Sequence, residues 1–233
     1  MIPLNAGPVY CEDLSATSGV FPVEPMNTIS NGVIILFGLA GLYFVWKRDP
    51  RAWDLYLLNM LTVFTGIGSG MWHGFRDGQW LFWEATSGLI FLFVFIFCWA
   101  RRLWSVPGAA VFLGAFYAGF RLSQPYWGRF QRWVAIAPIV VIASLALIAG
   151  TWRHSRQAAA YGAVALASAL TALTFRSIDL AVCSTIPFGT HFLWHSFLSG
   201  AGFIGVLGML KMRERGVSAN GRLPVWRATK AET

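Results

Sequence analysis

Residues 85–100 of the chain, ATSGLIFLFVFIFCWA, form a continuous run without a charged side chain. With the residues just before it, this run reaches the roughly 20 residues that a helix needs to cross a bilayer core about 30 Å thick. Further stretches along the chain have a similar length and composition. Because lipid offers the backbone no hydrogen-bond partner, we predict an all-α integral membrane protein with seven transmembrane helices. The expected helices are residues 27–46, 55–73, 80–100, 107–121, 133–150, 157–175 and 188–211.

The composition of the 233 residues agrees with this fold class, because 56% are hydrophobic and only 12% are charged. Soluble domains carry about 25% charged residues, so this chain has too few polar side chains to cover a soluble globule. A net charge of +8 could suggest a nucleic-acid partner, but in an apolar chain it is better explained by membrane orientation. We therefore expect membrane lipids and no nucleic acid as partners. The oligomeric state and the particular membrane stay open.

The basic residues are concentrated in alternate loops between the expected helices. Loops rich in lysine and arginine stay on the cytoplasmic side of a membrane. This rule places the amino terminus outside or in a lumen and the carboxyl terminus in the cytoplasm. The basic groups are Lys47, Arg48 and Arg51, then Arg101 and Arg102, then Arg153 and Arg156, then the tail from Lys211 onward.

The chain divides into three parts by composition. Residues 1–26 form an extramembrane segment, residues 27–211 the transmembrane domain, and residues 212–233 a basic tail that we expect to be flexible and cytoplasmic. The short loops leave no room for a separate soluble domain. The first residues lack a basic region followed by an apolar run, so we expect the first span to remain in the mature protein.

Three of the four histidines fall at the same predicted membrane depth. His191 and His195 are four residues apart and share one face of the last helix. His73 ends the second helix, after the glycine-rich residues 66–70. Taken singly, the pair could be interfacial and the glycines could serve packing. Together, three imidazoles with an open fourth position are the usual arrangement of a catalytic zinc site, so we predict zinc at His73, His191 and His195.

Two polar residues near this predicted site are candidates for catalysis. Ser69 lies one turn before His73 and on the same helix face. Glu84 lies inside the third expected helix, where a carboxylate is costly without a partner. Glu84 could orient a histidine, accept a proton during catalysis, or extend to the membrane interface.

Carboxylates also gather before the first span. Glu12, Asp13 and Glu24 could bind calcium through their oxygens. The alternative is an ordinary helix start, in which Asn27 or Thr28 is the cap and Glu24 favours the positive end of the helix. The residues alone leave both interpretations open.

The three cysteines divide between the two predicted sides of the membrane. Cys11 and Cys183 lie on the outer side, where disulfides persist, and could pair. Cys98 lies near the inner end of the third helix and is expected to be a free, buried thiol.

In their order along the chain, these residues resemble the alkaline ceramidase family, within the wider CREST superfamily of seven-span membrane hydrolases. The resemblance covers residue 9 to about residue 205. Each single motif is weak, whereas the ordered set is specific. The matching residues are Tyr10-Cys11-Glu12, Glu24 with Asn27 and Ser30-Asn31, Gly68-Ser69 with His73, Asp179 with Cys183, and His191-Phe192-Leu193-Trp194-His195.

The resemblance implies a seven-helix fold around an intramembrane zinc held by the three histidines. It implies that Ser69 stabilises the oxyanion, and that Glu84 stands where the family has an aspartate. It also implies a disulfide between Cys11 and Cys183. The family's calcium site matches this chain less well, because two of its oxygen-bearing positions are apolar here.

The predicted activity is zinc-dependent hydrolysis of the linear amide bond of ceramide or a related N-acyl lipid, which releases a fatty acid and a sphingoid-type amine. A different class, a lipid-responsive and receptor-like protein with a structural zinc, would share the metal. The short loops and tails offer such a receptor little signalling surface. A transporter or channel ranks last, because it would place charges midway along several spans, and here they cluster at one end.

Overall fold

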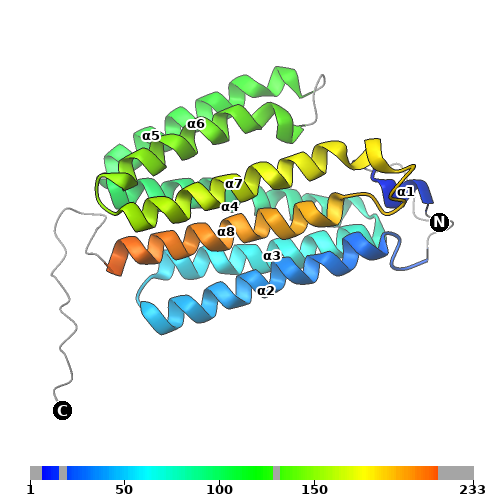
Figure 1. Ribbon diagram of the computed structural model, residues 1–233, viewed down its shortest axis with the longest axis horizontal. Coiled ribbons are helices and arrows are strands. Elements are labelled where there is room, and N and C mark those ends of the chain that lie inside the picture. Colours follow the sequence, from blue (N-terminus) through cyan, green and yellow to red (C-terminus); the bar gives the residue numbers. More distant parts are fainter. Residues whose placement is uncertain (1–6, 16–19, 128–131, 215–233) are drawn as a thin grey trace, which may run out of the picture.

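In the computed structural model the described residues are 7–15, 20–127 and 132–214, and they form helices with no strand among them. Long helices run side by side along one direction (Figure 1). Short α1 and the 3₁₀ turns η1 and η2 stand at helix ends. The elements are α1 Cys11–Ser15, α2 Pro25–Arg48, α3 Trp53–Phe75, α4 Gly78–Leu103, α5 Val106–Ser123, η1 Gln124–Tyr126, α6 Arg132–Trp152, α7 Arg156–Ile178, η2 Asp179–Val182 and α8 His191–Glu214. The all-helical prediction is confirmed.

Helix ends follow local capping chemistry. Asp77 accepts a hydrogen bond from the Gln79 amide at the start of α4, and Ser155 does the same for Ala158 at the start of α7. Pro25 begins α2, where its missing N–H costs nothing. These caps lie outside the apolar runs, so most helices extend beyond the predicted ranges by one to three residues at each end.

Six of the described helices are long and apolar enough to cross a membrane, which indicates a multi-pass membrane protein. The long helix α3 is not among the six. It carries Asn59, Ser69 and His73, and all three are buried inside the bundle. Its outward face is nevertheless apolar, with exposed Trp53, Leu57, Met60, Phe64 and Ile67. Seven spans and their orientation therefore stay predictions.

The helix α8 occupies the centre of the bundle. It packs against α2, α3, α4 and α7, while α5 and α6 form a pair that lies beside α4 and α7 (Figure 1). The start of α8, the end of α3 and short α1 meet at one end of the molecule. This arrangement brings distant parts of the sequence together at that end.

The largest hydrophobic core cluster lies toward the other end of the bundle. Val45, Leu55, Leu58 and Met209 are fully buried there. Cys98 belongs to the same cluster and is a free, buried thiol, as predicted. Most of the tail predicted from residue 212 onward lies outside the described residues, which end at 214.

Candidate metal centre and cavity

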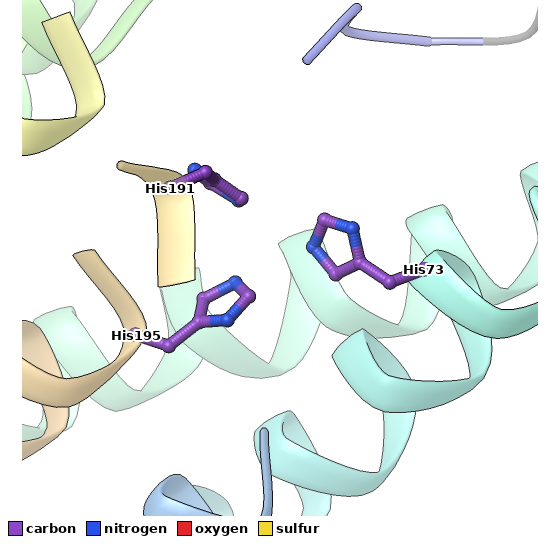
Figure 2. A group of neighbouring side chains, drawn as sticks. All are labelled: His73, His191 and His195. Atoms are coloured by element: carbon purple, nitrogen blue, oxygen red, sulfur yellow. The ribbon is translucent and has the colours of Figure 1, made fainter. Parts of the chain in front are cut away.

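The three predicted histidines meet at the end of the bundle near α1. His191 and His195 extend from the first turns of α8, and His73 extends toward them from the end of α3 (Figure 2). All three are buried, and one ring nitrogen from each lies within 4.8 Å of the others. The prediction that these residues form one group is confirmed.

Some ring nitrogens of the three histidines have a hydrogen-bond partner and the others have none among the described residues. His73 Nδ1 lies 2.5 Å from a Glu24 carboxylate oxygen, and His195 Nδ1 lies 2.7 Å from the Ser30 hydroxyl. The Nε2 atoms of His73 and His195, and both ring nitrogens of His191, have no hydrogen-bond partner among the described residues. Buried nitrogens without partners are costly. A metal ion would satisfy them, and three imidazoles, two of them oriented through their other nitrogen, fit that role.

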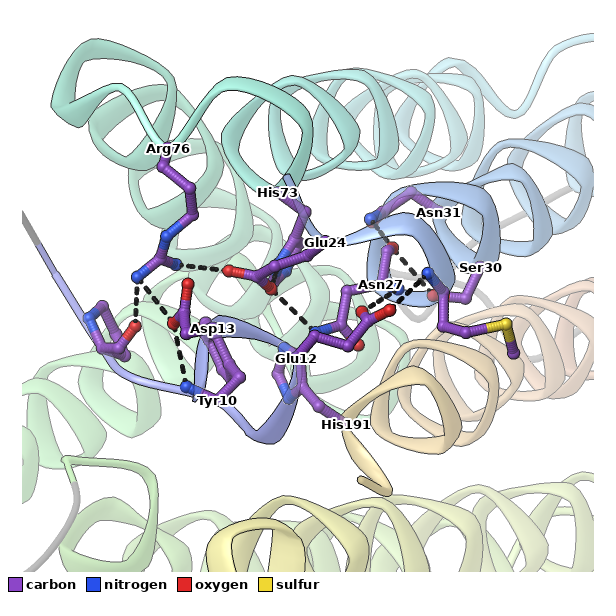
Figure 3. Close-up of polar contacts among 12 residues, drawn as sticks. Tyr10, Glu12, Asp13, Glu24, Asn27, Ser30, Asn31, His73, Arg76 and His191 are labelled. Carbon is purple, nitrogen blue, oxygen red and sulfur yellow. Dashed lines mark hydrogen bonds and ion pairs between the residues drawn. The ribbon is translucent and has the colours of Figure 1, made fainter. Parts of the chain in front are cut away.

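A buried arginine, Arg76, pairs with the carboxylate that contacts His73. Arg76 ends α3 in a left-handed conformation (φ 56°), and its guanidinium lies 2.9 Å from Glu24 and 2.9 Å from Asp13 (Figure 3). Burial, reinforced by the nearby charge of Glu24, raises the pKa of Asp13 to about 7 despite the opposing attraction of Arg76. Burial also raises the pKa of Glu24, again against Arg76. Glu24 thus links Arg76 to His73, a role that the sequence had assigned to Glu84 as one option.

The structure corrects the predicted cap of α2. No side chain at the start of α2 caps it locally. Glu12, which comes from α1, accepts hydrogen bonds from the backbone amides of Met26 and Asn27, at 2.7 and 2.8 Å. A carboxylate from another element therefore replaces the expected Asn27 or Thr28 cap, because α1 folds over the end of α2.

The three carboxylates proposed for calcium have protein partners in this arrangement. Glu12 binds backbone amides, whereas Asp13 and Glu24 share Arg76 as their positive charge. Among the described residues, the one group of at least three histidine, cysteine or acidic side chains with metal-ligand spacing is the histidine group. Calcium at Glu12, Asp13 and Glu24 stays a prediction.

Asp179, at the start of η2, fixes the beginning of α8. Its carboxylate accepts hydrogen bonds from the backbone amides of Thr190 and His191 at 2.7 and 2.9 Å, and from Cys11 at 3.1 Å. A disulfide joins Cys11 to Cys183 beside it, as the resemblance implied. In the sequence, Asp179 was only one of the residues that match the family, and nothing predicted that it would bind the first amides of α8.

Tyr10 covers the metal centre from the side of α1. Its buried ring stacks on His191 with the ring centroids 4.1 Å apart. The guanidinium of Arg176, from the last turn of α7, lies 4.6 Å from the centre of the same ring. Residue spacing gave no signal for these contacts, because they join three separate segments.

A cavity of about 550 Å³ opens beside the histidines. Ser69, Glu84, His191 and His195 contribute to its wall, and most of the remaining lining is apolar. Ser69 adjoins Glu84. The two helices approach closely there, since a β-carbon on Gly68 would lie 3.1 Å from the Glu84 backbone nitrogen. The structure thus brings both predicted catalytic residues to one cavity with two of the three histidines, His191 and His195.

The fourth histidine lies apart from this site. His154 is exposed in the turn between α6 and α7, at the opposite end of the bundle. His154 therefore does not belong to the histidine group.

No protein-family model and no curated protein matches this chain. The resemblance to alkaline ceramidases therefore rests on the ordered residues quoted above.

Proposed function

We propose that this protein is a zinc-dependent intramembrane amidase that hydrolyses ceramide or a related N-acyl lipid. The observation that carries the proposal is the convergence of three buried histidines, with unpartnered ring nitrogens, beside a largely apolar cavity. Three protein ligands with a free position are typical of catalytic zinc, whereas structural zinc sites usually have four.

The proposal includes seven membrane spans with the amino terminus outside. The α3 helix packs between α2 and α4, which are both candidate spans. Its exposed residues Trp53, Leu57, Met60, Phe64 and Ile67 follow helical spacing and form an apolar stripe suited to lipid. Its polar residues Asn59, Ser69 and His73 are buried inside the bundle, so they would not contact lipid if α3 crossed the membrane.

The cavity suits a substrate that combines a long acyl chain with one polar reacting group. Beyond Ser69 and Glu84 the wall extends through Phe95, Leu147 and Leu166, so an acyl chain would meet apolar side chains along its length. The amide would then lie near the histidines.

The residues around the cavity can divide the chemistry of amide hydrolysis. A zinc ion held by His73, His191 and His195 would polarise the amide carbonyl and activate water. Glu84 accepts the proton of the attacking water and delivers it to the leaving nitrogen. Ser69 donates a hydrogen bond to the oxygen of the carbonyl as negative charge develops there. Glu24 and Ser30 hold the rings of His73 and His195 in place.

The test combines metal analysis with turnover. Purified protein in detergent is expected to contain zinc and to release free fatty acid from an N-acyl lipid. His191→Ala should lose both, and His154→Ala, which alters the exposed histidine at the other end, should keep both. Fatty-acid release by His191→Ala without bound zinc would contradict the proposal.

The same experiment separates the receptor-like alternative. A protein whose zinc is only structural would bind zinc through the same histidines and lose stability in His191→Ala. It would release no fatty acid from any N-acyl lipid. Zinc binding without turnover would therefore favour the alternative.

A further inference from the structure

Arg176 is a buried cation that faces the cavity without an acidic partner. Its side chain lies in the last turn of α7 and is only 6% exposed. It lines the same cavity as Ser69 and Glu84. Among the described residues it forms no ion pair and no hydrogen bond, and its close contact is the ring of Tyr10. This is unusual, because a charged group inside a membrane protein normally pairs with another polar group.

The other buried arginines in the described chain have such partners. Arg76 pairs with Asp13 and Glu24, and Arg102 pairs with Asp54 at 2.7 Å. Glu84 lies within electrostatic range of Arg176 across the cavity but forms no ion pair with it. The carboxyl end of α7 favours a nearby cation, yet the helix dipole does not supply a hydrogen-bond acceptor to the guanidinium.

The position of Arg176 places it beside the reacting centre. Tyr10 contacts both Arg176 and His191, so one aromatic ring separates the guanidinium from a metal ligand. Arg176 also interacts electrostatically with all three histidines. If the amide lies at the histidines and the acyl chain follows the apolar part of the wall, the amine-side group is the part of the substrate left to face Arg176.

We propose that Arg176 binds a carboxylate on the amine side of the substrate, which makes N-acyl amino acids the preferred substrate class. This inference rests on the proposed amidase function and refines it. A guanidinium binds carboxylates through paired, charge-assisted hydrogen bonds. Arg176 is the one lysine or arginine among the described lining residues, which suits a singly charged carboxylate better than a phosphate dianion. The neutral head of ceramide would leave it unpaired.

Binding measurements with uncleavable probes test this inference separately from catalysis. In the probes a methylene replaces the amide nitrogen, so neither can be hydrolysed. One is the 4-oxo fatty acid that mimics an N-acylglycine, and the other is the matching 4-oxo alcohol that mimics an N-acylethanolamine. We expect the zinc-loaded wild-type protein in detergent to bind the acid about tenfold or more tightly than the alcohol.

Variants then assign the preference to Arg176. Arg176→Gln should remove the preference by weakening the acid alone, and Arg176→Lys should keep part of it. Arg153→Gln, an exposed arginine at the other end of the bundle, should leave it unchanged. If Arg176→Gln does not fold, comparing the affinities of the two probes for the wild type and for Arg176→Lys still shows whether the preference for the acid depends on Arg176.

Three results would overturn the inference. The wild type could bind both probes equally, or Arg176→Gln could weaken both to the same extent. In the third, Arg176→Gln would bind a simple fatty acid such as oleate less tightly than the wild type does, while its affinity for both probes stayed unchanged. That result would assign Arg176 to the carboxylate of the fatty-acid product. Failure of the amidase proposal is distinct, because it appears as absence of fatty-acid release while the acid probe still binds preferentially.

Discussion

Hydrogen bonds from Glu24 and Ser30 set the ring orientation of two histidines in the candidate metal site. Glu24 holds Nδ1 of His73 and Ser30 holds Nδ1 of His195, so the opposite ring nitrogens face the shared centre. Outer contacts of this kind typically change metal affinity or activity by about 10–100-fold. His191 has no such hydrogen bond among the described residues and is positioned instead by Tyr10 and by the backbone of α8.

Ser30→Ala should weaken zinc binding about tenfold, because the ring of His195 loses its anchor. Competition with a chelator of known affinity measures the change. The matched control is Ser177→Ala, which removes an exposed hydroxyl of α7. Equal zinc affinity in Ser30→Ala and wild type would show that Ser30 does not orient His195.

Ser69→Ala should leave zinc content unchanged while lowering kcat by about 100-fold, because a donor to the developing oxyanion is lost. Steady-state fatty-acid release and elemental analysis on the same preparation give both numbers. A rise in KM with unchanged kcat would instead assign Ser69 to substrate binding.

The raised pKa of Asp13 predicts a pH dependence of stability. The folded protein binds this proton more tightly than the unfolded chain, in which the pKa is near 3.8. The contribution of the Asp13 proton to the free energy of unfolding is therefore complete below about pH 4 and is lost as pH rises to about 7. Asp13→Asn should gain stability relative to wild type over this range, measured by thermal unfolding in detergent. The charges facing Asp13 are Arg76 and Glu24, and the opposite trend would mean that the Arg76 pair dominates.

The histidine group could be predicted from the sequence because helical spacing places His191 and His195 on one face. The hydrogen bonds that orient those histidines could not be predicted from the sequence. Glu24 and His73 are 49 residues apart, and Ser30 and His195 are 165 apart. No local periodicity reports such contacts, since they depend on how α2, α3 and α8 pack. Arg76 shows the same limit, because nothing local reveals that its charge is directed inward.

Among the helices and turns, the connection between α7 and α8 sets the position of His191 in the candidate metal site. Asp179 binds the first amides of α8 and also the start of α1, and the disulfide joins the same two regions. The sequence predicted the seven long helices to within a few residues because apolar length controls them. It placed the last helix at residue 188, whereas α8 begins at His191. The turn before it is defined by Asp179, whose partners are backbone atoms that no side-chain pattern reveals.

Asp179→Ala should lower both stability and zinc content, because three buried amides lose their acceptor and His191 shifts. The expected cost is about 1–3 kcal/mol for a lost buried partner. Asp77→Ala is the matched control, since it removes an exposed helix cap from α4 and should lower stability by about 1 kcal/mol without affecting zinc. Thermal unfolding and elemental analysis check both variants. Full zinc content in Asp179→Ala would mean that other contacts position His191.

In the molecule as a whole, the histidine group lies at one end of the bundle and the hydrophobic core lies toward the other. The core around Leu55, Leu58 and Met209 is fully buried, and near it the buried Arg102 pairs with Asp54. The histidines, the carboxylates of Glu12, Glu24 and Asp179, and the arginines Arg76 and Arg176 gather near α1. The sequence indicated this division through the distribution of its charges.

The seven-span proposal predicts that the two ends of α3 lie on opposite sides of the membrane. In a Cys98→Ala background, single cysteines replace exposed Arg51 before α3 and exposed Asp77 after it. A membrane-impermeant maleimide applied to the outer side should label the cysteine at 77 and leave the one at 51 unlabelled until the membrane is opened. Labelling of both from the same side would contradict the proposal.

A zinc titration with simultaneous measurement of product shows whether the histidine group holds a catalytic zinc ion. Metal-free protein in detergent receives zinc in substoichiometric steps while fatty-acid release from an N-acyl lipid is followed. We predict no release without metal and a linear rise to a plateau at about one zinc per chain. Fatty-acid release by the metal-free protein, or saturation with zinc without any release, would contradict the account.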